Sequence, residues 1–417
     1  MLELYFSHPT ILRQLRRGPL SPVLDQWAAA LQQAGYAECV ASDMLAIGGE
    51  LNRYLQRLDV TDVCMIDETT TQQFLDTECY PYGAYGHSAG TLRTFLAYLR
   101  HREIIPPAPT PPITDPIGLL LERYATFLRT VRGVASSTYR ASLLCAERFL
   151  GFYRERDAGL DLSRLTAQTV LDFLTQWYAY RPGKAWQTHL AQDLRNFLRF
   201  LRWESIVSQE LERVVMAPRQ YTLSSVPKHL PWPLVEQLLA GVDLTHPQGR
   251  RDRAILHLLA YLGLRASEVV HLTFADLDWR AGVLKIPNTK TRRGRILPLI
   301  HGVGTVLADY ILHERPAVTM PEVFVRGHAP YGPLKSAHGV SEVVHRHLKR
   351  LNIPAPKYGA HLLRHSFATQ LVNQGTPIKE VADLLGHMDI NTTAIYTKVD
   401  TTHLRAAALP FPTGGLA

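Results

Sequence analysis

The sequence is poor in cysteine and lacks long hydrophobic runs. Its 417 residues include only four cysteines, and no two of them form a Cys-x-x-Cys pair. This disfavours a disulfide framework or a zinc-thiolate site and favours a protein with reduced thiols. The first residues lack the features of a secretory signal, and the richest apolar run, Ala254 to Leu264, is shorter than the ~18 residues that span a bilayer. We therefore expect a soluble, cytoplasmic protein.

Charge and composition place the chain in the ordinary globular class. Apolar residues make up 46% of it and charged residues 20%, which excludes a disordered, low-complexity protein. The 45 lysines and arginines exceed the 37 aspartates and glutamates, and the isoelectric point is about 9.3. A basic excess of this size is compatible with a nucleic-acid partner but does not require one.

Two proline-rich breaks divide the chain. The first contains prolines 106, 107, 109, 111, 112 and 116, and the second is rich in Ser, Thr and Pro; neither can sustain a helix. We predict the following organisation: a helical module at 1–104, a linker at 105–116, a second helical module at 117–216, a linker at 217–227, and a C-terminal domain at 228–417.

The two helical modules resemble each other. Leu92 to Arg100 matches Leu194 to Arg202 at an offset of 102. Three further matches keep the same order, namely 70–75 with 169–174, 52–55 with 147–150, and 24–27 with 121–124. The near-constant offset predicts a duplicated four-helix module, although amphipathic helices rich in Leu, Phe and Arg can look alike without duplication.

Basic residues beside apolar helix faces are candidates for contacts with DNA phosphates. The second module offers Arg195, Arg199 and Arg202, and we expect these side chains to contact DNA. In the C-terminal domain, two strand-like runs, Val283 to Pro287 and Arg295 to Leu299, flank a polar turn with a glycine. This pattern predicts a β-hairpin. Its tip carries Lys290, Arg292 and Arg293, which would suit a DNA groove or serve only as a solubilising loop.

The C-terminal domain also contains a set of candidate anion-binding residues. Arg265 follows a helix-ending Gly263, so it should lie beside the positive N-terminus of the next helix. His361 and Arg364 are three residues apart on one helix face and can reach the same anion. His361 and His365 could instead form half of a metal site, but the sequence indicates no third ligand, and we expect no metal and no cofactor.

The order of these residues resembles the tyrosine recombinase, or phage integrase, family. That family's motif is an arginine, a hairpin lysine, His-x-x-Arg, a histidine or tryptophan, and a tyrosine near the C-terminus. This sequence supplies all six types, at Arg265, Lys290, His361, Arg364, His387 and Tyr396. The resemblance implies a mainly α fold with a small antiparallel β-sheet in the catalytic domain, and helical, SAM-like core-binding modules. The first module is an addition to the usual two-domain plan.

The resemblance also implies a reaction. Tyr396 would attack a DNA phosphate to give a 3′-phosphotyrosine link and a free 5′-hydroxyl, with His361 as the general base. The two arginines and His387 would stabilise the negative charge, and Lys290 would protonate the 5′-oxygen. We therefore expect a site-specific recombinase of a mobile element that acts on double-stranded DNA as a homotetramer, with companion recombinases as further partners. A type IB topoisomerase-like enzyme and a catalytically idle DNA-binding protein are the alternatives.

Overall fold

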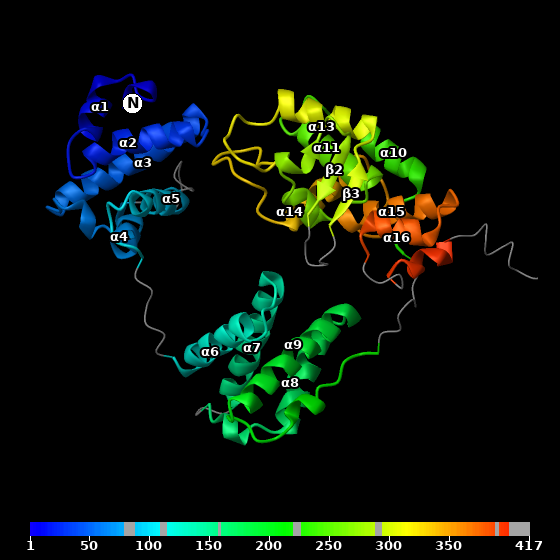
Figure 1. Cartoon of the computed structure of the whole chain (residues 1–417). Coiled ribbons are helices and arrows are strands. Elements are labelled where there is room, and N and C mark those ends of the chain that lie inside the picture. The colour runs from blue at the N-terminus through cyan, green and yellow to red at the C-terminus, as the bar shows by residue number, and fades with distance from the viewer. Residues whose placement is uncertain are drawn as a thin grey trace, which may run out of the picture. The chain divides into compact units, whose positions relative to one another are not determined.

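The computed structural model describes residues 1–78, 88–108, 115–156, 160–219, 227–287, 294–387 and 392–399. The chain is mainly helical with one small three-stranded antiparallel sheet (Figure 1), which confirms the predicted fold class. Residues 109–224 form one compact unit, and residues 1–108 and 225–417 are grouped in the other. The grouping differs from the predicted three-part division, yet residues 1–108 have a hydrophobic core of their own.

Among its described residues, the first segment contains five α-helices and two 3-10 turns. In chain order these are η1 (Leu2–Leu4), α1 (Pro9–Leu15), α2 (Ser21–Gln33), α3 (Glu38–Arg57), η2 (Val63–Met65), α4 (Glu68–Glu78) and α5 (Ser88–His101). Trp27 of α2 and Phe95 of α5 are both buried, and their ring centroids lie 4.4 Å apart. Such aromatic contacts add to the burial energy that holds these helices together.

The described part of the second segment contains four α-helices and two 3-10 turns. These are α6 (Pro116–Thr130), α7 (Ser136–Arg156), η3 (Leu162–Arg164), α8 (Ala167–Tyr180), α9 (Lys184–Trp203) and η4 (Leu211–Arg213). The Asp115 and Thr166 side chains cap the first turns of α6 and α8 by accepting backbone N–H bonds, which satisfies donors that a helix start leaves unpaired.

Buried side chains recur at corresponding places in the two segments. Tyr124 and Phe197 contact each other as Trp27 and Phe95 do, with centroids 5.0 Å apart. In the third pair of matches the register differs from the predicted offset of 95. With an offset of 98, buried residues of α3 align with buried residues of α7. The aligned positions are 44, 47, 48, 51, 52, 54 and 55 in α3 and 142, 145, 146, 149, 150, 152 and 153 in α7. This register differs from the predicted one by three residues, nearly one helical turn.

The third segment contains the sheet and seven α-helices among the described residues. Its elements are α10 (Trp232–Ala240), α11 (Gly249–Tyr261), α12 (Ala266–Val270), η5 (Phe274–Asp276), β1 (Leu277–Asp278), β2 (Val283–Ile286), β3 (Arg295–Pro298), α13 (His301–His313), α14 (Ala337–Arg350), α15 (Ala360–Asn373), α16 (Ile378–Leu385) and η7 (Ala394–Val399). Strands β2 and β3 pair antiparallel, with Ile286 opposite Arg295. The predicted hairpin strands are therefore present, while its tip at 288–293 lies outside the described residues.

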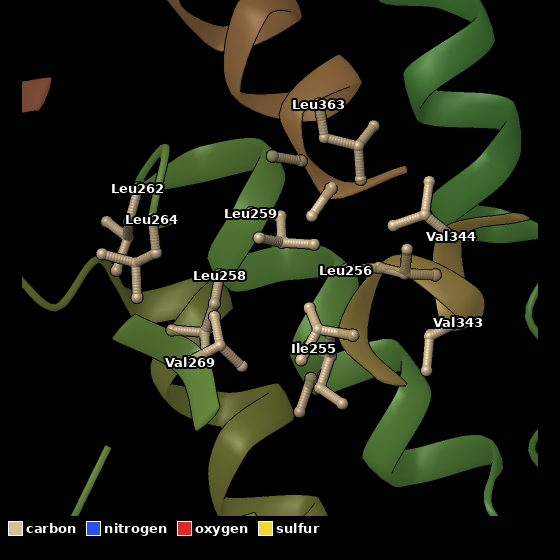
Figure 2. Packing of buried hydrophobic residues seen from close by; sticks show 14 of the residues in the cluster. Ile255, Leu256, Leu258, Leu259, Leu262, Leu264, Val269, Val343, Val344 and Leu363 are labelled. Atoms are coloured by element: carbon tan, nitrogen blue, oxygen red, sulfur yellow. The ribbon is translucent and has the colours of Figure 1, made fainter. Parts of the chain in front are cut away.

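Helix α11 lies at the centre of this segment's core. Ile255, Leu256, Leu258 and Leu259 are completely buried and pack with side chains of α14 and α15 (Figure 2). A helix that is apolar on most of its surface is typical of a helix surrounded by others. This burial accounts for the apolar run noted in the sequence. No helix in the described part of the chain is long and apolar enough to cross a membrane.

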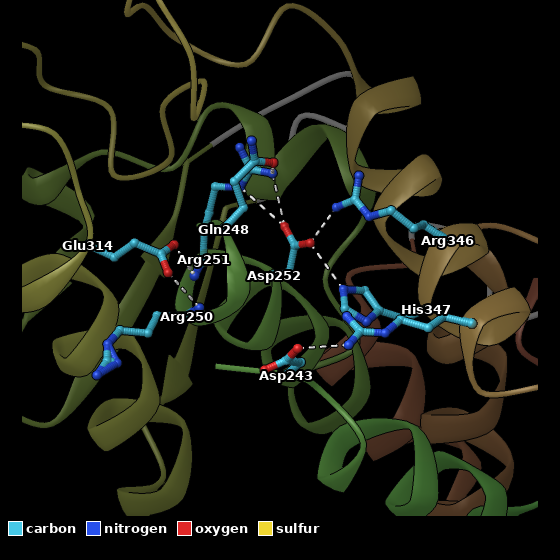
Figure 3. A network of polar contacts seen from close by, with 9 residues as sticks. Asp243, Gln248, Arg250, Arg251, Asp252, Glu314, Arg346 and His347 are labelled. Carbon is cyan, nitrogen blue, oxygen red and sulfur yellow. Dashed lines mark hydrogen bonds and ion pairs between the residues drawn. The ribbon is translucent and has the colours of Figure 1, made fainter. Parts of the chain in front are cut away.

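A polar network fixes the N-terminal end of α11 (Figure 3). The buried Asp252 carboxylate accepts hydrogen bonds from Arg251 Nη2 at 2.9 Å and from Arg346, and it lies 3.0 Å from His347 Nε2. Glu314, which follows α13, accepts the backbone N–H groups of Arg250 and Arg251 at 2.9 Å each. These contacts join α11 to α13 and α14, so the position of the opposite end of α11 is also determined.

Replacing Leu259 with Ala tests the role of α11 in stability. Because Leu259 is fully buried, the substitution leaves a cavity and should lower the free energy of unfolding by about 2–5 kcal/mol. Leu312→Ala on α13 is the matched control, since 74% of that side chain is exposed, and it should change the stability by less than about 0.5 kcal/mol. Urea unfolding followed by circular dichroism measures both. Equal effects of the two substitutions would contradict the proposed core.

Candidate active site

Arg265 lies at the N-terminal end of α12, as the sequence predicts. Gly263 precedes it with a φ of +57°, and a Cβ atom there would lie 2.5 Å from Phe367 Cδ1, so this turn requires glycine. The backbone N–H of Arg265 and its Nη1 both donate to the Glu268 carboxylate at 2.8 Å. Its Nη2 donates to the carbonyl oxygen of Gly386 at 3.1 Å.

Glu268 also binds a second arginine. Arg295, the first residue of β3, donates from Nη1 and Nη2 to the two carboxylate oxygens at 2.9 and 2.8 Å. Burial raises the pKa of Glu268, but the hydrogen bonds from Arg295 and Arg265 outweigh burial and lower this pKa to about 2. The carboxylate therefore joins α12 to the strand that immediately follows the predicted Lys290 hairpin tip.

Arg364 points toward the same region from α15. Its Nη1 donates to the Gly263 carbonyl, and its Nη2 donates to the Leu385 carbonyl at 2.6 Å. Leu385 and Gly386 are adjacent residues, so Arg364 and Arg265 meet at the C-terminal end of α16. Burial and the nearby Arg265 lower the pKa of Arg364 to about 9. Two guanidiniums held this close by backbone carbonyls create a site of positive potential.

The histidines respond to this potential. Burial, Arg364 and Arg265 lower the pKa of His361, and the same causes lower that of His387 to about 4. Gly386 has a φ of +64°, which turns the chain after α16 and brings His387 beside the arginines. Its Nδ1 lies 2.7 Å from Thr393 Oγ1. Both imidazoles are therefore neutral near pH 7 and can donate a hydrogen bond from one ring nitrogen.

Tyr396 lies in η7 and is 1% exposed. It packs against an apolar cluster that includes Ala368, Val372 and Leu385. Its hydroxyl lies 2.7 Å from Nδ1 of His365, a residue that our sequence-based prediction left out of the catalytic set. Burial raises the pKa of Tyr396 to about 12, although Arg364 partly opposes this effect. The phenol is therefore protonated near pH 7 and can donate its proton to a neighbour.

The structure thus groups five of the six predicted catalytic residues, and Lys290 lies outside the described residues. It also adds Glu268, Arg295 and His365 to the site. A carboxylate three residues after Arg265 is a recognisable helix-capping signal, and His365 directly follows Arg364. Nothing in the local pattern indicates the partner of Arg295. In the described part of the chain, no group of three His, Cys, Asp or Glu residues is placed to hold a metal ion.

Two of the arginines predicted to contact DNA have partners within the protein. Arg195 donates to the Val215 carbonyl at 2.7 Å. Arg202 forms ion pairs with Glu210 and Glu212 at 2.5 and 3.1 Å. Arg199 is exposed, and Arg292 and Arg293 lie outside the described residues.

Comparisons with known proteins identify the family of this chain. Residues 233–403 match the model of the phage integrase family. The chain is 36% identical to the putative integrase/recombinase y4rF of Sinorhizobium fredii, with 99% of this chain and 96% of that protein covered. It is 30% identical to the tyrosine recombinase XerD of Listeria innocua, with 69% of this chain and 96% of that protein covered.

Solved structures share the fold. The XerH site-specific recombinase bound to its difH substrate, in a pre-cleavage complex, superposes with a TM-score of 0.51 at 22% identity and covers 69% of this chain and 82% of that chain. The post-cleavage complex of XerH on a palindromic difH substrate gives a TM-score of 0.53 at 19% identity over 88% of this chain and 95% of that chain. The chain belongs to the tyrosine recombinase, or phage integrase, family, and is a site-specific integrase/recombinase of that family.

Replacing Glu268 with Gln tests the two-arginine contact. The folded-state pKa of about 2 lies below the ordinary value of 4.5, so ionised Glu268 stabilises the fold above pH 4.5, and this contribution is lost as the pH falls toward 2. We expect Glu268→Gln to lower the free energy of unfolding by about 3 kcal/mol at pH 7 and by less at pH 3.5. Glu380→Gln, at an exposed position of α16, is the control. Urea unfolding at both pH values measures the loss of stability. If Glu268→Gln loses as much unfolding free energy at pH 3.5 as at pH 7, ionised Glu268 does not stabilise the fold through the two arginines.

Proposed function

We propose that the chain cuts and rejoins double-stranded DNA through a covalent bond between Tyr396 and a 3′-phosphate. The observation that carries the proposal is the meeting of Arg265 and Arg364 at the C-terminal end of α16, with His387 following directly. Tyr396 is held by α15, the helix that also provides Arg364. Cationic donors and a phenol in one site are the groups that a phosphodiester transfer to tyrosine requires.

The arginines stabilise the phosphate in this proposal. Attack on phosphorus increases the negative charge on the nonbridging oxygens, and guanidinium donors bind such oxygens strongly. Arg364 is buried, and burial together with the positive charge of Arg265 lowers its pKa. A phosphodiester bound there would bring a negative charge beside both guanidiniums. His361 and His387, both neutral, add hydrogen-bond donors without adding further positive charge.

Lys290 is the proposed acid for the leaving 5′-oxygen. Strands β2 and β3 fix the base of its hairpin, and Arg295 joins β3 to Glu268 beside Arg265. This contact gives β3, which follows the hairpin tip in the sequence, a defined position relative to Arg265. The phosphotyrosine bond conserves the energy of the broken bond, so a 5′-hydroxyl of another strand can reverse the step without a nucleotide cofactor.

The two helical modules are proposed to be copies with different roles. Residues 1–108 contain eight arginines and no lysine against twelve acidic residues, whereas residues 115–219 contain fifteen basic and eleven acidic residues. A module of net negative charge is repelled by DNA phosphates, and one of net positive charge is attracted to them. We propose that residues 115–219 form the core-binding domain and that the first copy works without extensive phosphate contacts.

The turn between α8 and α9 is the proposed DNA-contacting surface of the second module. No carboxylate occurs between Asp172 and Asp193. Arg181 in this turn and Lys184, the first residue of α9, are exposed, and Tyr180 at the end of α8 is 78% exposed. The Arg181 guanidinium lies 5.3 Å from the ring centre of Trp186. Exposed cations without neighbouring acids suit phosphate contacts.

The assembly and the biological role are also part of the proposal. A λ integrase has been solved as a dimer bound to a core site, and its structure superposes on this chain with a TM-score of 0.51 at 16% identity. We propose that four copies of this chain meet on two DNA sites in the cytoplasm and exchange strands in pairs, with companion recombinases as further partners. The integrase/recombinase names of its relatives favour service to a mobile element over chromosome maintenance.

A nicked suicide substrate tests the reaction. The cognate site is first sought as inverted repeats in the DNA that flanks the gene. The wild-type protein should form a covalent DNA adduct that Tyr396→Phe cannot form, whereas Tyr261→Phe, on α11, should form it normally. EDTA should leave the yield unchanged, because the proposed site uses arginines rather than a metal ion.

The same assay separates the alternatives. A protein that binds the site but never forms an adduct would be an idle accessory protein. Relaxation of supercoiled DNA carrying a single site, without strand exchange between two sites, would identify a topoisomerase-like enzyme. Cleavage abolished by EDTA would contradict the metal-free site.

The proposed DNA-contacting turn predicts a change in salt dependence. Arg181→Ala combined with Lys184→Ala should weaken binding to a duplex and reduce the slope of log K against log salt by about 2, since each lost phosphate contact contributes about 0.9. Arg202→Ala is the control. It should leave the slope unchanged, because the Arg202 guanidinium forms ion pairs with Glu210 and Glu212. Fluorescence anisotropy over a salt series measures both. An unchanged slope for the double variant would rule out this surface.

A further inference from the structure

We propose that Thr393 is a positioning residue, whose hydroxyl fixes the ring orientation and the tautomer of His387 so that Nε2 of His387 donates a hydrogen bond to the DNA phosphate. This inference rests on the proposed function and deepens it, because it names the group that prepares one of the proposed phosphate donors. The contact that carries it joins Oγ1 of Thr393 to Nδ1 of His387 at 2.7 Å, a normal hydrogen-bond distance.

Thr393 is bonded to two residues of the proposed site. It is completely buried and immediately precedes η7. Its carbonyl oxygen accepts the backbone N–H of Tyr396 at 3.0 Å, while its hydroxyl contacts the ring of His387. A buried hydroxyl needs a hydrogen-bond partner, and the imidazole provides one. The backbone of Thr393 therefore holds the turn of the proposed nucleophile, and its side chain holds the proposed donor.

The backbone of His387 is fixed without the help of Thr393. Its N–H donates to the Ala382 carbonyl at 2.9 Å, at the end of α16. Gly386 before it has a left-handed conformation, and a Cβ atom there would lie 2.8 Å from Nη1 of Arg295, so the turn is closely packed. These contacts leave the imidazole free to rotate about its two side-chain bonds. The hydrogen bond to Thr393 removes that freedom.

The phosphate decides which tautomer of His387 is useful. Burial, Arg364 and Arg265 lower the pKa of His387 to about 4, so the ring is neutral near pH 7 and carries one N–H. A hydroxyl can either donate to Nδ1 or accept from it, so the contact by itself allows both tautomers. The nonbridging oxygens of a phosphodiester only accept hydrogen bonds. Nε2 must therefore carry the proton, and the Thr393 hydroxyl donates to Nδ1.

The arginines favour the other tautomer. A guanidinium has donors only, so Arg265 and Arg364 stabilise an imidazole that presents an acceptor to them. An imidazole whose acceptor nitrogen is Nε2 cannot donate to the phosphate. A hydrogen bond from Thr393 to Nδ1 opposes this effect, because it stabilises the tautomer with the proton on Nε2. The hydroxyl thus keeps His387 ready as a donor.

Two substitutions at position 393 test the hydroxyl. Thr393→Val keeps the shape of the side chain but has no hydroxyl, whereas Thr393→Ser keeps the hydroxyl. With the nicked suicide substrate at saturating DNA, Thr393→Val should slow adduct formation by about 10- to 100-fold. Thr393→Ser should remain close to the wild-type rate. Fluorescence anisotropy should show DNA affinity retained in both variants, because the arginines still bind the phosphate.

Thr369→Val is the matched control. Thr369 lies on α15 and is 3% exposed, and its Oγ1 has no hydrogen-bond partner in the described part of the chain. The same chemical change therefore removes a buried hydroxyl without breaking a hydrogen bond. We expect Thr369→Val to form the adduct at the wild-type rate. A loss as large as that of Thr393→Val would show that any such change in the buried region slows cleavage.

A double-mutant cycle separates positioning of His387 from a structural role in the Tyr396 turn. His387→Ala removes one donor to the phosphate and should slow adduct formation by about 10²- to 10³-fold. If Thr393 acts through His387, Thr393→Val should cause no further loss in the His387→Ala protein. If Thr393 acts only by holding the turn, the two losses should multiply.

The outcomes are distinct. A wild-type rate for Thr393→Val, equal losses for Thr393→Val and Thr393→Ser, or multiplied losses in the cycle would overturn the assignment and leave the proposed function intact. A wild-type protein that forms no adduct on its cognate site would overturn both. Melting temperatures show whether each variant is folded, and Thr393→Ala replaces Thr393→Val if that variant is not.

Discussion

One buried carboxylate organises the catalytic region. Glu268 accepts four hydrogen bonds from Arg265 and Arg295, and these two residues come from a helix start and from a strand. Without the carboxylate, the two guanidiniums would repel each other in a region with little solvent to screen them. With it, Arg265 is oriented toward the C-terminal end of α16, and β3 is fixed beside α12. The positions of β3 and of the Arg265 side chain both depend on this contact.

The site nevertheless retains an excess of positive charge. Arg265, Arg295 and Arg364 share Glu268 as the nearest anion in the described part of the chain, and the histidines around them have lowered pKa values. The polar network of Asp252 and the packing of α11 supply the rigid support that such repulsion requires (Figures 2 and 3). An anion would stabilise this arrangement, and a phosphodiester supplies both the charge and the reacting atom. The repulsion among these cations is relieved when a phosphodiester binds, and this relief favours substrate binding.

The two helical modules show how similar helices can differ in use. Their buried aromatic pairs and helix order correspond, whereas their surfaces carry opposite net charge. Burial restricts which residues can stand at the core positions, because removing a buried aromatic side chain lowers the free energy of unfolding by several kcal/mol. Exposed positions have no such constraint and can change with the partner. The proposed division of labour, with DNA held by residues 115–219, follows from this difference in constraint.

The sequence by itself determined the helical modules, the hairpin strands and five of the residues that meet in the site. These features depend on local order: apolar spacing sets the helices, and glycine sets the turns before Arg265 and His387. Only the tertiary structure decided that Glu268 binds Arg295, that Arg195 and Arg202 have internal partners, and that His365 contacts Tyr396. Each of these contacts joins residues that are eight to 31 positions apart. Helical periodicity gives the direction in which a side chain points, but the packing of other elements decides what it meets there.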